Sequence, residues 1–251
     1  QWMSEIIERT ESLCPRCLRR IPASIAREGD DVYMEKECPE HGSFSTLLWQ
    51  GADSWIRWDR LNDWEPESYE TCDFSTRVER GCPFDCGLCP EHLRQACIVV
   101  MEVTNRCNLN CPICFADSGQ HIFEPDMEDC EGMFQTVLDR ACKHSTPAVQ
   151  LSGGEPTVRD DLPEIVARGR EYGLDYIMIN TNGLRIANDR EYLRRLKESG
   201  AQVIYLQFDG VSNSVYREIR GRDLMDIKER ALRNCAEVGM SVVLVPLIIK
   251  G

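Results

Sequence analysis

The sequence predicts an α/β fold with a curved sheet of parallel strands, preceded by an irregular, cysteine-rich N-terminal region. Three observations support this. From Ile98 onward, apolar β-rich runs alternate with amphipathic helical runs. Three cysteines with C-x3-C-x2-C spacing follow the first strand-like run. Polar residues follow the next three strands, and in parallel α/β barrels the functional groups gather on the loops after the strands.

The elements of the α/β part follow one another in a regular order. We expect strands at 98–104, 147–152, 175–180, 202–208 and 241–248, and helices at 126–143, 162–172, 189–199 and 224–238. The run from Asp161 to Glu164 resembles a capping box with a proline in the first helical turn. Helices should end at three glycines, Gly173, Gly200 and Gly239. Strands that alternate with helices imply parallel pairing through right-handed crossovers.

Composition divides the chain into three segments. Residues 1–70 are rich in Trp, Glu and Asp, with short strand-like pieces such as 44–49. Residues 71–97 are dense in cysteine and lack regular periodicity, and residues 98–251 form the α/β part. The chain stops just after the fifth predicted strand, so we expect a further region beyond it.

Charge and cysteine content narrow the class of protein. A net charge of −13 argues against wrapping nucleic acid, which requires clustered Lys and Arg. No apolar run approaches the roughly 18 to 20 residues that cross a bilayer, and no secretory leader is visible. We therefore expect a cytoplasmic protein. In a reducing compartment, the 14 cysteines indicate metal ligation rather than disulfides.

The most informative motif is the loop that carries Cys107, Cys111 and Cys114. A strand, a turn and three thiols on one short loop are typical of a metal site. A cubane iron–sulfur cluster has four irons and takes four cysteines when the protein alone holds it. Three cysteines leave one iron open to a small chelating molecule, which favours catalysis over electron storage.

Polar residues that follow the next strands should lie on the same rim. They are Ser152 to Pro156 after the second strand, Asn180 to Gly183 after the third, and Gln207 to Gly210 after the fourth. The two glycines before Glu155 allow a close ligand approach or a positive φ, and the Glu155 carboxylate can accept from an ammonium group. Alone, this motif would be an ordinary glycine-rich turn. One strand after an open cysteine triad, it indicates a binding site.

The cysteine loop and the Gly-Gly-Glu-Pro motif together resemble the radical S-adenosylmethionine (SAM) superfamily. The resemblance covers residues 98–251 and implies a partial (β/α)6 barrel whose sixth unit is missing. It implies a 4Fe–4S cluster on the cysteine triad, with the fourth iron chelated by the amino and carboxylate groups of SAM. The residue before the third cysteine is usually aromatic in the family, whereas here it is Ile113, with Phe115 after the triad.

The same resemblance implies which residues bind SAM. The methionine end would lie against Gly153, Gly154 and Glu155, with Glu155 accepting hydrogen bonds from the amino group. An electron from the cluster would cleave the sulfonium and give a 5′-deoxyadenosyl radical that abstracts hydrogen from an unactivated C–H bond. Further contacts are assigned to Asn180, and to Gln207 and Asp209, which otherwise cap the turn after their strand. No side chain is assigned a catalytic role.

A second C-x3-C-x2-C motif, Cys82, Cys86 and Cys89, precedes the first strand of the α/β part. Because Cys97 is a nearby fourth thiol, we expect these four residues to hold a closed, auxiliary 4Fe–4S cluster, with Cys72 as the reserve ligand. A structural zinc site formed by the same thiols is the alternative.

Two short knuckles near the N-terminus, Cys14 with Cys17 and Cys38 with His41, predict a mononuclear tetrahedral site of Cys3His type. A rubredoxin-like iron site in which Cys72 replaces His41 is the alternative, since such sites serve zinc and iron alike. The metal would stabilise a module too small to rely on its own core.

The remaining cysteines and the tryptophans are expected to serve packing. Small core positions are predicted for Cys130, Cys142 and Cys235. A compact core of the N-terminal module is predicted for Trp49, Trp55, Trp58 and Trp64, with a hydrophobic substrate surface as the alternative.

The run from Gly81 to Ala116 is distinctive beyond the superfamily motif. It resembles a group that includes archaeal tetraether lipid synthases and class D radical SAM methyltransferases acting on pterins. The resemblance favours C–C bond formation between lipid chains, with methylation of a pterin or similar small molecule as the alternative. It implies an electron donor such as ferredoxin or flavodoxin, a further C-terminal cluster and, for a lipid substrate, contact with a membrane surface. A non-catalytic multi-cluster electron-transfer protein is the alternative from a different class.

Overall fold

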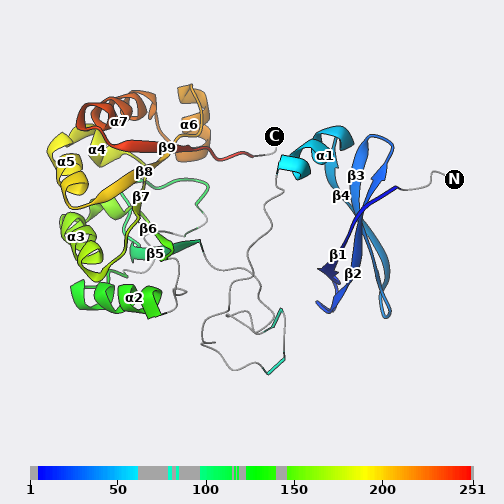
Figure 1. Cartoon of the computed structure of the whole chain (residues 1–251). Helices are drawn as coiled ribbons and strands as arrows, with labels where there is room; N and C mark the ends of the chain where they lie inside the picture. Colours follow the sequence, from blue (N-terminus) through cyan, green and yellow to red (C-terminus); the bar gives the residue numbers. More distant parts are fainter. Residues whose placement is uncertain are drawn as a thin grey trace. The chain divides into compact units, whose positions relative to one another are not determined.

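The computed structural model describes residues 5–61, 79–80, 83–84, 97–114, 116, 118, 123–139 and 146–249. The chain divides into two compact units, residues 1–95 and residues 96–251 (Figure 1). A four-stranded sheet lies in the first unit and a five-stranded sheet in the second. No helix in the described ranges is long and apolar enough to cross a lipid bilayer.

The first unit contains a regular antiparallel sheet, where the sequence predicts mostly irregular structure. Strands β1 (Glu5–Leu13), β2 (Arg20–Glu28), β3 (Asp31–Cys38) and β4 (Gly42–Gln50) pair in chain order, and helix α1 (Ala52–Leu61) follows. The predicted strand-like run 44–49 lies within β4. Charged residues break the alternating pattern that would have revealed the other strands, as in Glu-Ile-Ile-Glu-Arg-Thr-Glu of β1.

Two small apolar clusters pack in this unit. The first joins Cys14, Ile21 and Cys38, and the second joins Ile25, Val32 and Ala52, with Trp55 packed against it. The predicted tryptophan core is formed only in part, because Trp49 is 42% exposed and Trp58 is 64% exposed. Trp64 lies outside the described residues. A core this small fits the expectation that a metal stabilises the module.

The second unit is the predicted α/β part. Its strands are β5 (Ile98–Thr104), β6 (Ala148–Gly153), β7 (Ile177–Thr181), β8 (Ala201–Gln207) and β9 (Ser241–Val245), all parallel and adjacent in chain order. Its helices are α2 (Met127–Asp139), η1 (Pro156–Val158), α3 (Leu162–Tyr172), α4 (Leu184–Asn188), α5 (Arg190–Glu198), α6 (Asn213–Arg220) and α7 (Met225–Val238). The alternation of strands and helices confirms the predicted fold class.

Three short helices, η1, α4 and α6, have no counterpart in the prediction. Each lies at the C-terminal end of a strand, in a run too short for a helical period to be recognised. Helices α3 and α7 end, as expected, at Gly173 and Gly239, both in the left-handed region. The predicted capping box is absent, since the Asp161 side chain makes no cap bond and instead pairs with Arg159.

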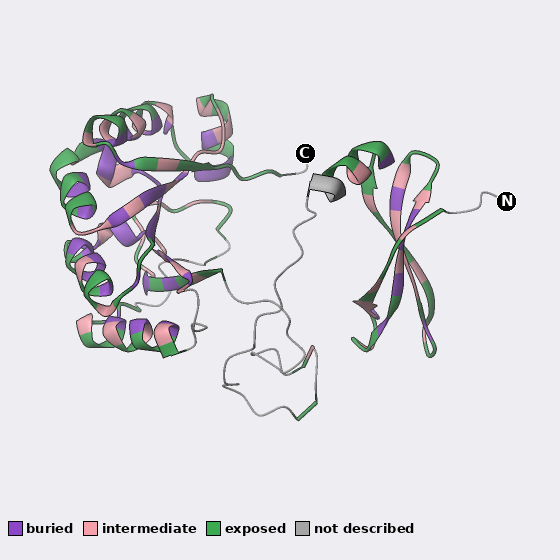
Figure 2. Ribbon diagram, in the orientation of Figure 1, coloured by how far each residue is buried: buried purple, intermediate pink, exposed green. Residues whose placement is uncertain are grey.

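Side chains along the parallel strands alternate between two faces of the sheet. Met101 and Val103 of β5 and Leu151 of β6 point into the main apolar core. Buried residues concentrate between the strands and the helices on that side (Figure 2). Cys130 and Cys235 are buried in this core, as predicted, and Cys142 lies outside the described residues. The opposite face carries polar residues and leads to the site.

Candidate active site

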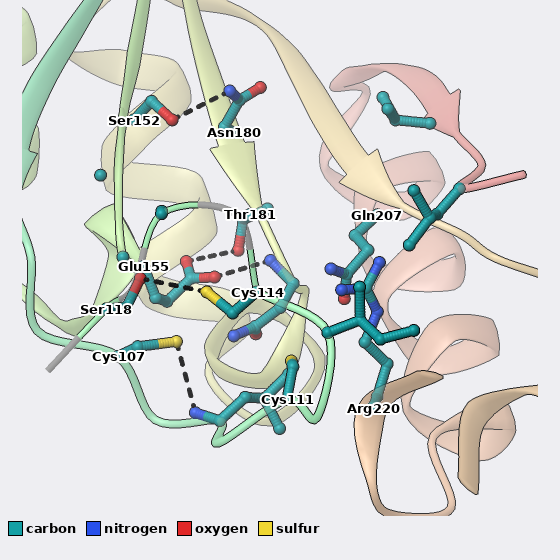
Figure 3. Close-up of a pocket in the computed structure, with 18 of the residues that line it drawn as sticks. Cys107, Cys111, Cys114, Ser118, Ser152, Glu155, Asn180, Thr181, Gln207 and Arg220 are labelled. Carbon is teal, nitrogen blue, oxygen red and sulfur yellow. Dashed lines mark hydrogen bonds between the residues drawn. The ribbon is translucent and has the colours of Figure 1, made fainter. Parts of the chain in front are cut away.

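A cavity of about 500 Å³ lies at the C-terminal ends of the parallel strands, where the sequence predicts the functional site (Figure 3). Its walls come from the loop after β5, from the Gly-Gly-Glu loop after β6, and from the ends of β7, β8 and β9. The predicted site residues that line it are Cys107, Cys111, Cys114, Gly153, Gly154, Glu155, Asn180 and Gln207. Loops distant in the sequence therefore meet around one volume.

The two ends of the cysteine loop are held together by residues that precede Cys107 and residues that follow Cys114. Asn105 exchanges two hydrogen bonds with Phe123, and Arg106 forms a bidentate ion pair with Glu124. Cys107 is half-buried, and its Sγ accepts from the backbone N–H of Leu109 at 3.4 Å. Burial raises the pKa of the Cys107 thiol, which a positive metal centre would reverse.

The two glycines hold the Gly-Gly-Glu loop against the cysteine loop. Gly153 has a φ of +136°, and a Cβ built there would lie 1.8 Å from the carbonyl oxygen of Thr104. A Cβ on Gly154 would lie 2.5 Å from the carbonyl oxygen of Arg106. Backbone hydrogen bonds from Gly154 and Glu155 to these same two carbonyls close the contact. The glycines are therefore required by backbone-to-backbone packing that shapes the floor of the cavity.

The carboxylate of Glu155 is held mainly by the protein itself. Its Oε1 accepts from the backbone N–H of Thr157 at 3.1 Å and from the hydroxyls of Thr157 and Thr181 at 2.5 and 2.7 Å. Its Oε2 accepts from the backbone N–H of Asn182 at 2.6 Å. Burial raises the pKa of Glu155, and these hydrogen bonds oppose that rise. An amino group could reach only the acceptor capacity that remains on Oε2, and the expected contact of Glu155 with SAM stays a prediction.

Asn182 connects three parts of the site. Its side-chain Nδ2 donates to Asn108 Oδ1 on the cysteine loop at 2.7 Å, while its backbone N–H binds Glu155. Its carbonyl oxygen accepts from Lys228 Nζ at 2.6 Å. Lys228 is fully buried, and burial lowers its pKa to about 8. The buried amine of Lys228 thus holds the turn after β7, and this turn is hydrogen-bonded to the cysteine loop through Asn182 and Asn108.

Asp209, expected to contact the cofactor, pairs with a cation beside the cavity, and its contact with SAM stays a prediction. Its side chain is fully buried and forms a bidentate ion pair with Arg220, with distances of 2.8 and 2.9 Å. It also accepts from the backbone N–H of Leu247 at 3.1 Å. With its amide oxygen turned toward Arg220, Gln207 adds a contact of 3.0 Å to the guanidinium. Arg220, rather than Asp209, lines the cavity, beside Gln207 (Figure 3).

Several residues of this site escape sequence reasoning. Thr157 directly follows the Gly-Gly-Glu-Pro motif, and Thr181 lies within the polar run from Asn180 to Gly183. Nothing in the sequence links either hydroxyl to Glu155. Arg220 lies on α6, a helix that the sequence does not predict. Lys228 lies on a predicted helix, but a lysine there is expected on the exposed face rather than the buried one. A lysine in an otherwise apolar helical stripe, between Met225 and Ala231, was the available signal.

The N-terminal knuckles converge as predicted. The ligand atoms of Cys14, Cys17, Cys38 and His41 all lie within 4.8 Å of one another. His41 Nδ1 lies 3.5 Å from Cys38 Sγ and 3.7 Å from Cys14 Sγ. Burial raises the pKa of Cys14, but hydrogen bonds from the backbone of Cys17 and Arg16 outweigh it and lower the pKa to about 6. This donor set fits a single tetrahedral ion.

Most of the predicted ligands of the auxiliary cluster lie outside the described residues. Cys82, Cys86 and Cys89 lie outside the described residues, as does Cys72. Cys97 is exposed and directly precedes β5. Because the triad follows β5, Cys97 lies at the opposite end of that strand, and the assignment stays a prediction.

Comparison with known proteins decides the family. The model of the radical SAM superfamily matches residues 101–251, more than half of the chain. The chain belongs to the radical SAM superfamily. A second model, described as the HMPTM N-terminal zinc ribbon domain, matches residues 6–50, which contain β1 to β4 and all four knuckle ligands. Both units of the radical SAM chain therefore have counterparts in known families.

Curated relatives match over different parts of the chain. A 7,8-dihydro-6-hydroxymethylpterin dimethyltransferase from Methanocaldococcus jannaschii is 43% identical over 97% of this chain and 47% of its own length. An Fe-coproporphyrin III synthase from Methanosarcina barkeri is 38% identical over 61% of this chain and 38% of its own length. A probable GTP 3′,8-cyclase from Methanothermobacter thermautotrophicus is 28% identical over 63% and 50%. The chain thus spans half or less of these relatives' lengths.

Solved structures support the fold. Streptococcus suis SuiB bound to its precursor peptide SuiA aligns with a TM-score of 0.52 and 21% identity, over 63% of this chain and 34% of that one. SuiB bound to S-adenosylmethionine aligns with a TM-score of 0.50 and 19% identity, over 62% and 33%. At these identities the likeness shows a shared fold.

Membership of the superfamily implies SAM and a 4Fe–4S cluster, and the site has a suitable donor set. Three thiols share one cavity with a backbone floor that admits no side chain at Gly153 or Gly154. In the described chain, the four ligand atoms that converge within 4.8 Å are those of the N-terminal knuckles. Three thiolates are the number that leaves one iron of a 4Fe–4S cluster open to SAM.

Proposed function

We propose that this radical SAM enzyme acts on a pterin and that its product is a methylated pterin, in which a methyl group from a one-carbon donor replaces a hydrogen atom abstracted by the 5′-deoxyadenosyl radical. The observation that carries the proposal is the 43% identity to a 7,8-dihydro-6-hydroxymethylpterin dimethyltransferase across 97% of the chain. The N-terminal match to a domain described by the abbreviation HMPTM extends the similarity beyond the barrel. The sequence favoured joining of lipid chains, but the three relatives above are named for ring compounds, so we adopt the pterin alternative.

We assign the radical-generating cluster to Cys107, Cys111 and Cys114. When bound, the cluster supplies the electron that cleaves the sulfonium of SAM into methionine and a 5′-deoxyadenosyl radical, at the expense of a low-potential donor such as ferredoxin or flavodoxin. The chain contributes position and charge. SAM would lie along the backbone of Gly153 and Gly154, with its amino group near Glu155 Oε2.

Arg220 provides the cation that a SAM carboxylate needs within this cavity. Asp209 holds the guanidinium in a fixed orientation through two hydrogen bonds, and Arg220 therefore does not have to be ordered when the ligand binds. Asn180 and Gln207 present amide groups to the same volume. We assign these polar residues to orientation of SAM and substrate, and no side chain to proton transfer.

We assign a structural zinc ion to Cys14, Cys17, Cys38 and His41. His41 Nδ1 lies 3.5 Å from Cys38 Sγ and 3.7 Å from Cys14 Sγ, which favours the Cys3His site over the rubredoxin-like alternative. A second 4Fe–4S cluster on Cys82, Cys86, Cys89 and Cys97 remains our assignment for the segment before β5. It would carry electrons rather than bind SAM, because its four thiols leave no open iron.

Transfer of deuterium tests the substrate. The protein is loaded anaerobically with iron and sulfide and given SAM, dithionite and 6-hydroxymethyl-7,8-dihydropterin deuterated at its saturated carbons. We expect deuterium in 5′-deoxyadenosine, because hydrogen abstraction moves one hydrogen atom from a substrate carbon to the 5′ carbon. A parallel reaction with deuterated archaeal-type lipid chains should leave 5′-deoxyadenosine unlabelled. Label from the lipid but not from the pterin would overturn the proposal.

A further inference from the structure

A row of polar residues crosses the open face of the parallel sheet. In the strand register, Glu102 of β5 pairs with Ser152 of β6, and Asn180 of β7 pairs with Tyr205 of β8. A hydrogen bond of 3.1 Å from Asn180 Nδ2 to Ser152 Oγ joins the two halves. We call Glu102, Ser152, Asn180 and Tyr205 the polar row. Neighbouring strands lie about 4.8 Å apart, so the row spans a width suited to a planar bicyclic ring.

The row lies on the side of the sheet that faces away from the helices. Met101 and Val103, on either side of Glu102, are buried in the apolar core, so strand alternation directs Glu102 to the opposite face. Ser152, Asn180 and Tyr205 line the cavity that contains the cysteine triad. Figure 3 shows the Ser152–Asn180 pair on neighbouring strands, in the same pocket as the three cysteines. Glu102 is exposed beside this cavity, at the position of β5 that pairs with Ser152.

The row presents hydrogen-bonding groups that the described protein leaves available. Within the described ranges, neither the Glu102 carboxylate nor the Tyr205 hydroxyl has a hydrogen-bond partner, and Asn180 uses its amide nitrogen alone. A carboxylate accepts hydrogen bonds and cannot donate them when ionised. A ligand that covers Glu102 must therefore supply donors, because an unpaired charge loses its hydration at a large cost.

We propose that the polar row binds the heterocycle of the substrate, with Glu102 as the specificity-determining residue for a 2-amino-4-oxo pyrimidine edge. This inference rests on the proposed function, since the pterin is the ligand. The N3–H and 2-amino groups of a pterin are two parallel donors, and a carboxylate accepts both in a bidentate arrangement. The side chains of Asn180 and Tyr205, which line the cavity, then contact the other ring.

Binding of two ring systems to the reconstituted protein tests this assignment. The probes are 6-hydroxymethyl-7,8-dihydropterin and its 2-oxo counterpart, the corresponding dihydrolumazine, measured by equilibrium dialysis without reductant. The lumazine places an oxygen where the pterin has its 2-amino group, and this oxygen would face the Glu102 carboxylate. We expect the wild type to prefer the pterin by about 100-fold, the size of effect that a mismatched polar partner produces.

The variant E102Q distinguishes a binding role from a solvated charge. A glutamine offers one acceptor and one donor, which match the N3–H and O2 of the lumazine, so the preference should fall to within about threefold or reverse. E198Q, which neutralises an exposed carboxylate on α5, is the matched control and should keep the wild-type preference. Equal iron content and equal circular dichroism show that each variant is folded.

Two results would overturn the inference in different ways. If E102Q keeps the wild-type preference while pterin still binds, Glu102 does not select the ring and the proposed function is unaffected. If the wild type binds neither probe, the pterin substrate itself is wrong and the assignment of the polar row falls with it.

Discussion

The amide of Asn182 donates a hydrogen bond to Asn108 at 2.7 Å, across a sequence separation of 74 residues. Asn108 lies between the first two cysteines of the triad, and Asn182 lies at the end of the third parallel strand. The same residue binds Glu155 through its backbone N–H and Lys228 through its carbonyl. The position of the cysteine loop is thus coupled to the Gly-Gly-Glu loop and to α7 through one residue.

Replacing Asn182 by alanine should loosen the cysteine loop without unfolding the sheet. We expect N182A to bind SAM about tenfold more weakly. The side chain loses two hydrogen bonds, one to Asn108 and one from the backbone N–H of Leu184, each contributing about 1 kcal/mol, and part of this loss affects the SAM site. Equilibrium dialysis with SAM on the cluster-loaded protein measures this. N188A, at an exposed asparagine that also bonds a backbone carbonyl, is the control. Equal affinities in both variants would contradict the coupling.

Alanine at Gly153 should disrupt the floor of the cavity. The new Cβ would lie 1.8 Å from a backbone carbonyl at a φ of +136°, so the two loops must separate. We expect a loss of about 2 to 4 kcal/mol in the free energy of unfolding, together with loss of SAM binding. G132A on α2, where a Cβ meets nothing within 4 Å, should instead stabilise by about 0.5 to 1 kcal/mol. Urea titrations compare them, and similar effects at both sites would refute the packing argument.

The pair of Asp209 and Arg220 should behave as a unit. D209N leaves the guanidinium without its charge partner in a mostly buried position, and we expect a loss of about 3 kcal/mol in unfolding free energy. R220M should cost a similar amount, and the double variant D209N/R220M should cost less than the sum of the two. A double-mutant cycle by urea unfolding gives the coupling energy. Additive losses would show that the bidentate pair contributes little.

The amine of Lys228 should make stability depend on pH above neutrality. Burial lowers its pKa to about 8 from 10.5, so between these values the unfolded state holds more of the proton than the folded state. The folded state is then stabilised as the pH rises, with a slope of at most about 1.4 kcal/mol per pH unit. The unfolding free energy of the wild type relative to K228M should therefore increase from pH 8 to pH 10. A constant difference would contradict a lowered pKa of Lys228 in the folded protein.

Removal of the N-terminal metal should unfold the first unit. Its two apolar clusters are small, and the four ligands join the connection between β1 and β2 to the turn between β3 and β4. We expect one equivalent of zinc by elemental analysis, and loss of the antiparallel sheet on treatment with a strong chelator. H41A should lower the zinc affinity by 10-fold or more, whereas C72A should leave it unchanged. Retention of zinc by H41A and its loss in C72A would favour the rubredoxin-like ligand set.

The sequence predicts the barrel strands well because their side chains follow a strong apolar period. The predicted strand 98–104 coincides with β5, and the predicted helix 162–172 coincides with α3. The cysteine triad and the glycine pair could be placed on one rim, since loops after parallel strands meet at one edge. The antiparallel N-terminal sheet was not predicted, because charged residues occupy much of β1 and no apolar alternation is visible there.

The roles of the carboxylates depend on partners far away in the sequence. Glu155 and Asp209 were both placed near the cofactor, but the donors that fill them come from Thr181, Asn182 and Arg220. Sequence spacing gives the strand end on which a carboxylate lies and says nothing about which donor reaches it first. Glu102 shows the reverse case, because it belongs to no motif and its proposed role rests on its register beside Ser152.

Release of 5′-deoxyadenosine by two sets of cysteine variants tests whether the triad after β5 holds the open iron. Wild-type protein, C107A/C111A/C114A and C82A/C86A/C89A are loaded anaerobically with iron and sulfide and given SAM and dithionite. We predict 5′-deoxyadenosine from the wild type and from C82A/C86A/C89A, and none from C107A/C111A/C114A. Release from C107A/C111A/C114A, or no release from wild-type protein whose clusters are intact, would show that SAM cleavage does not take place on this triad.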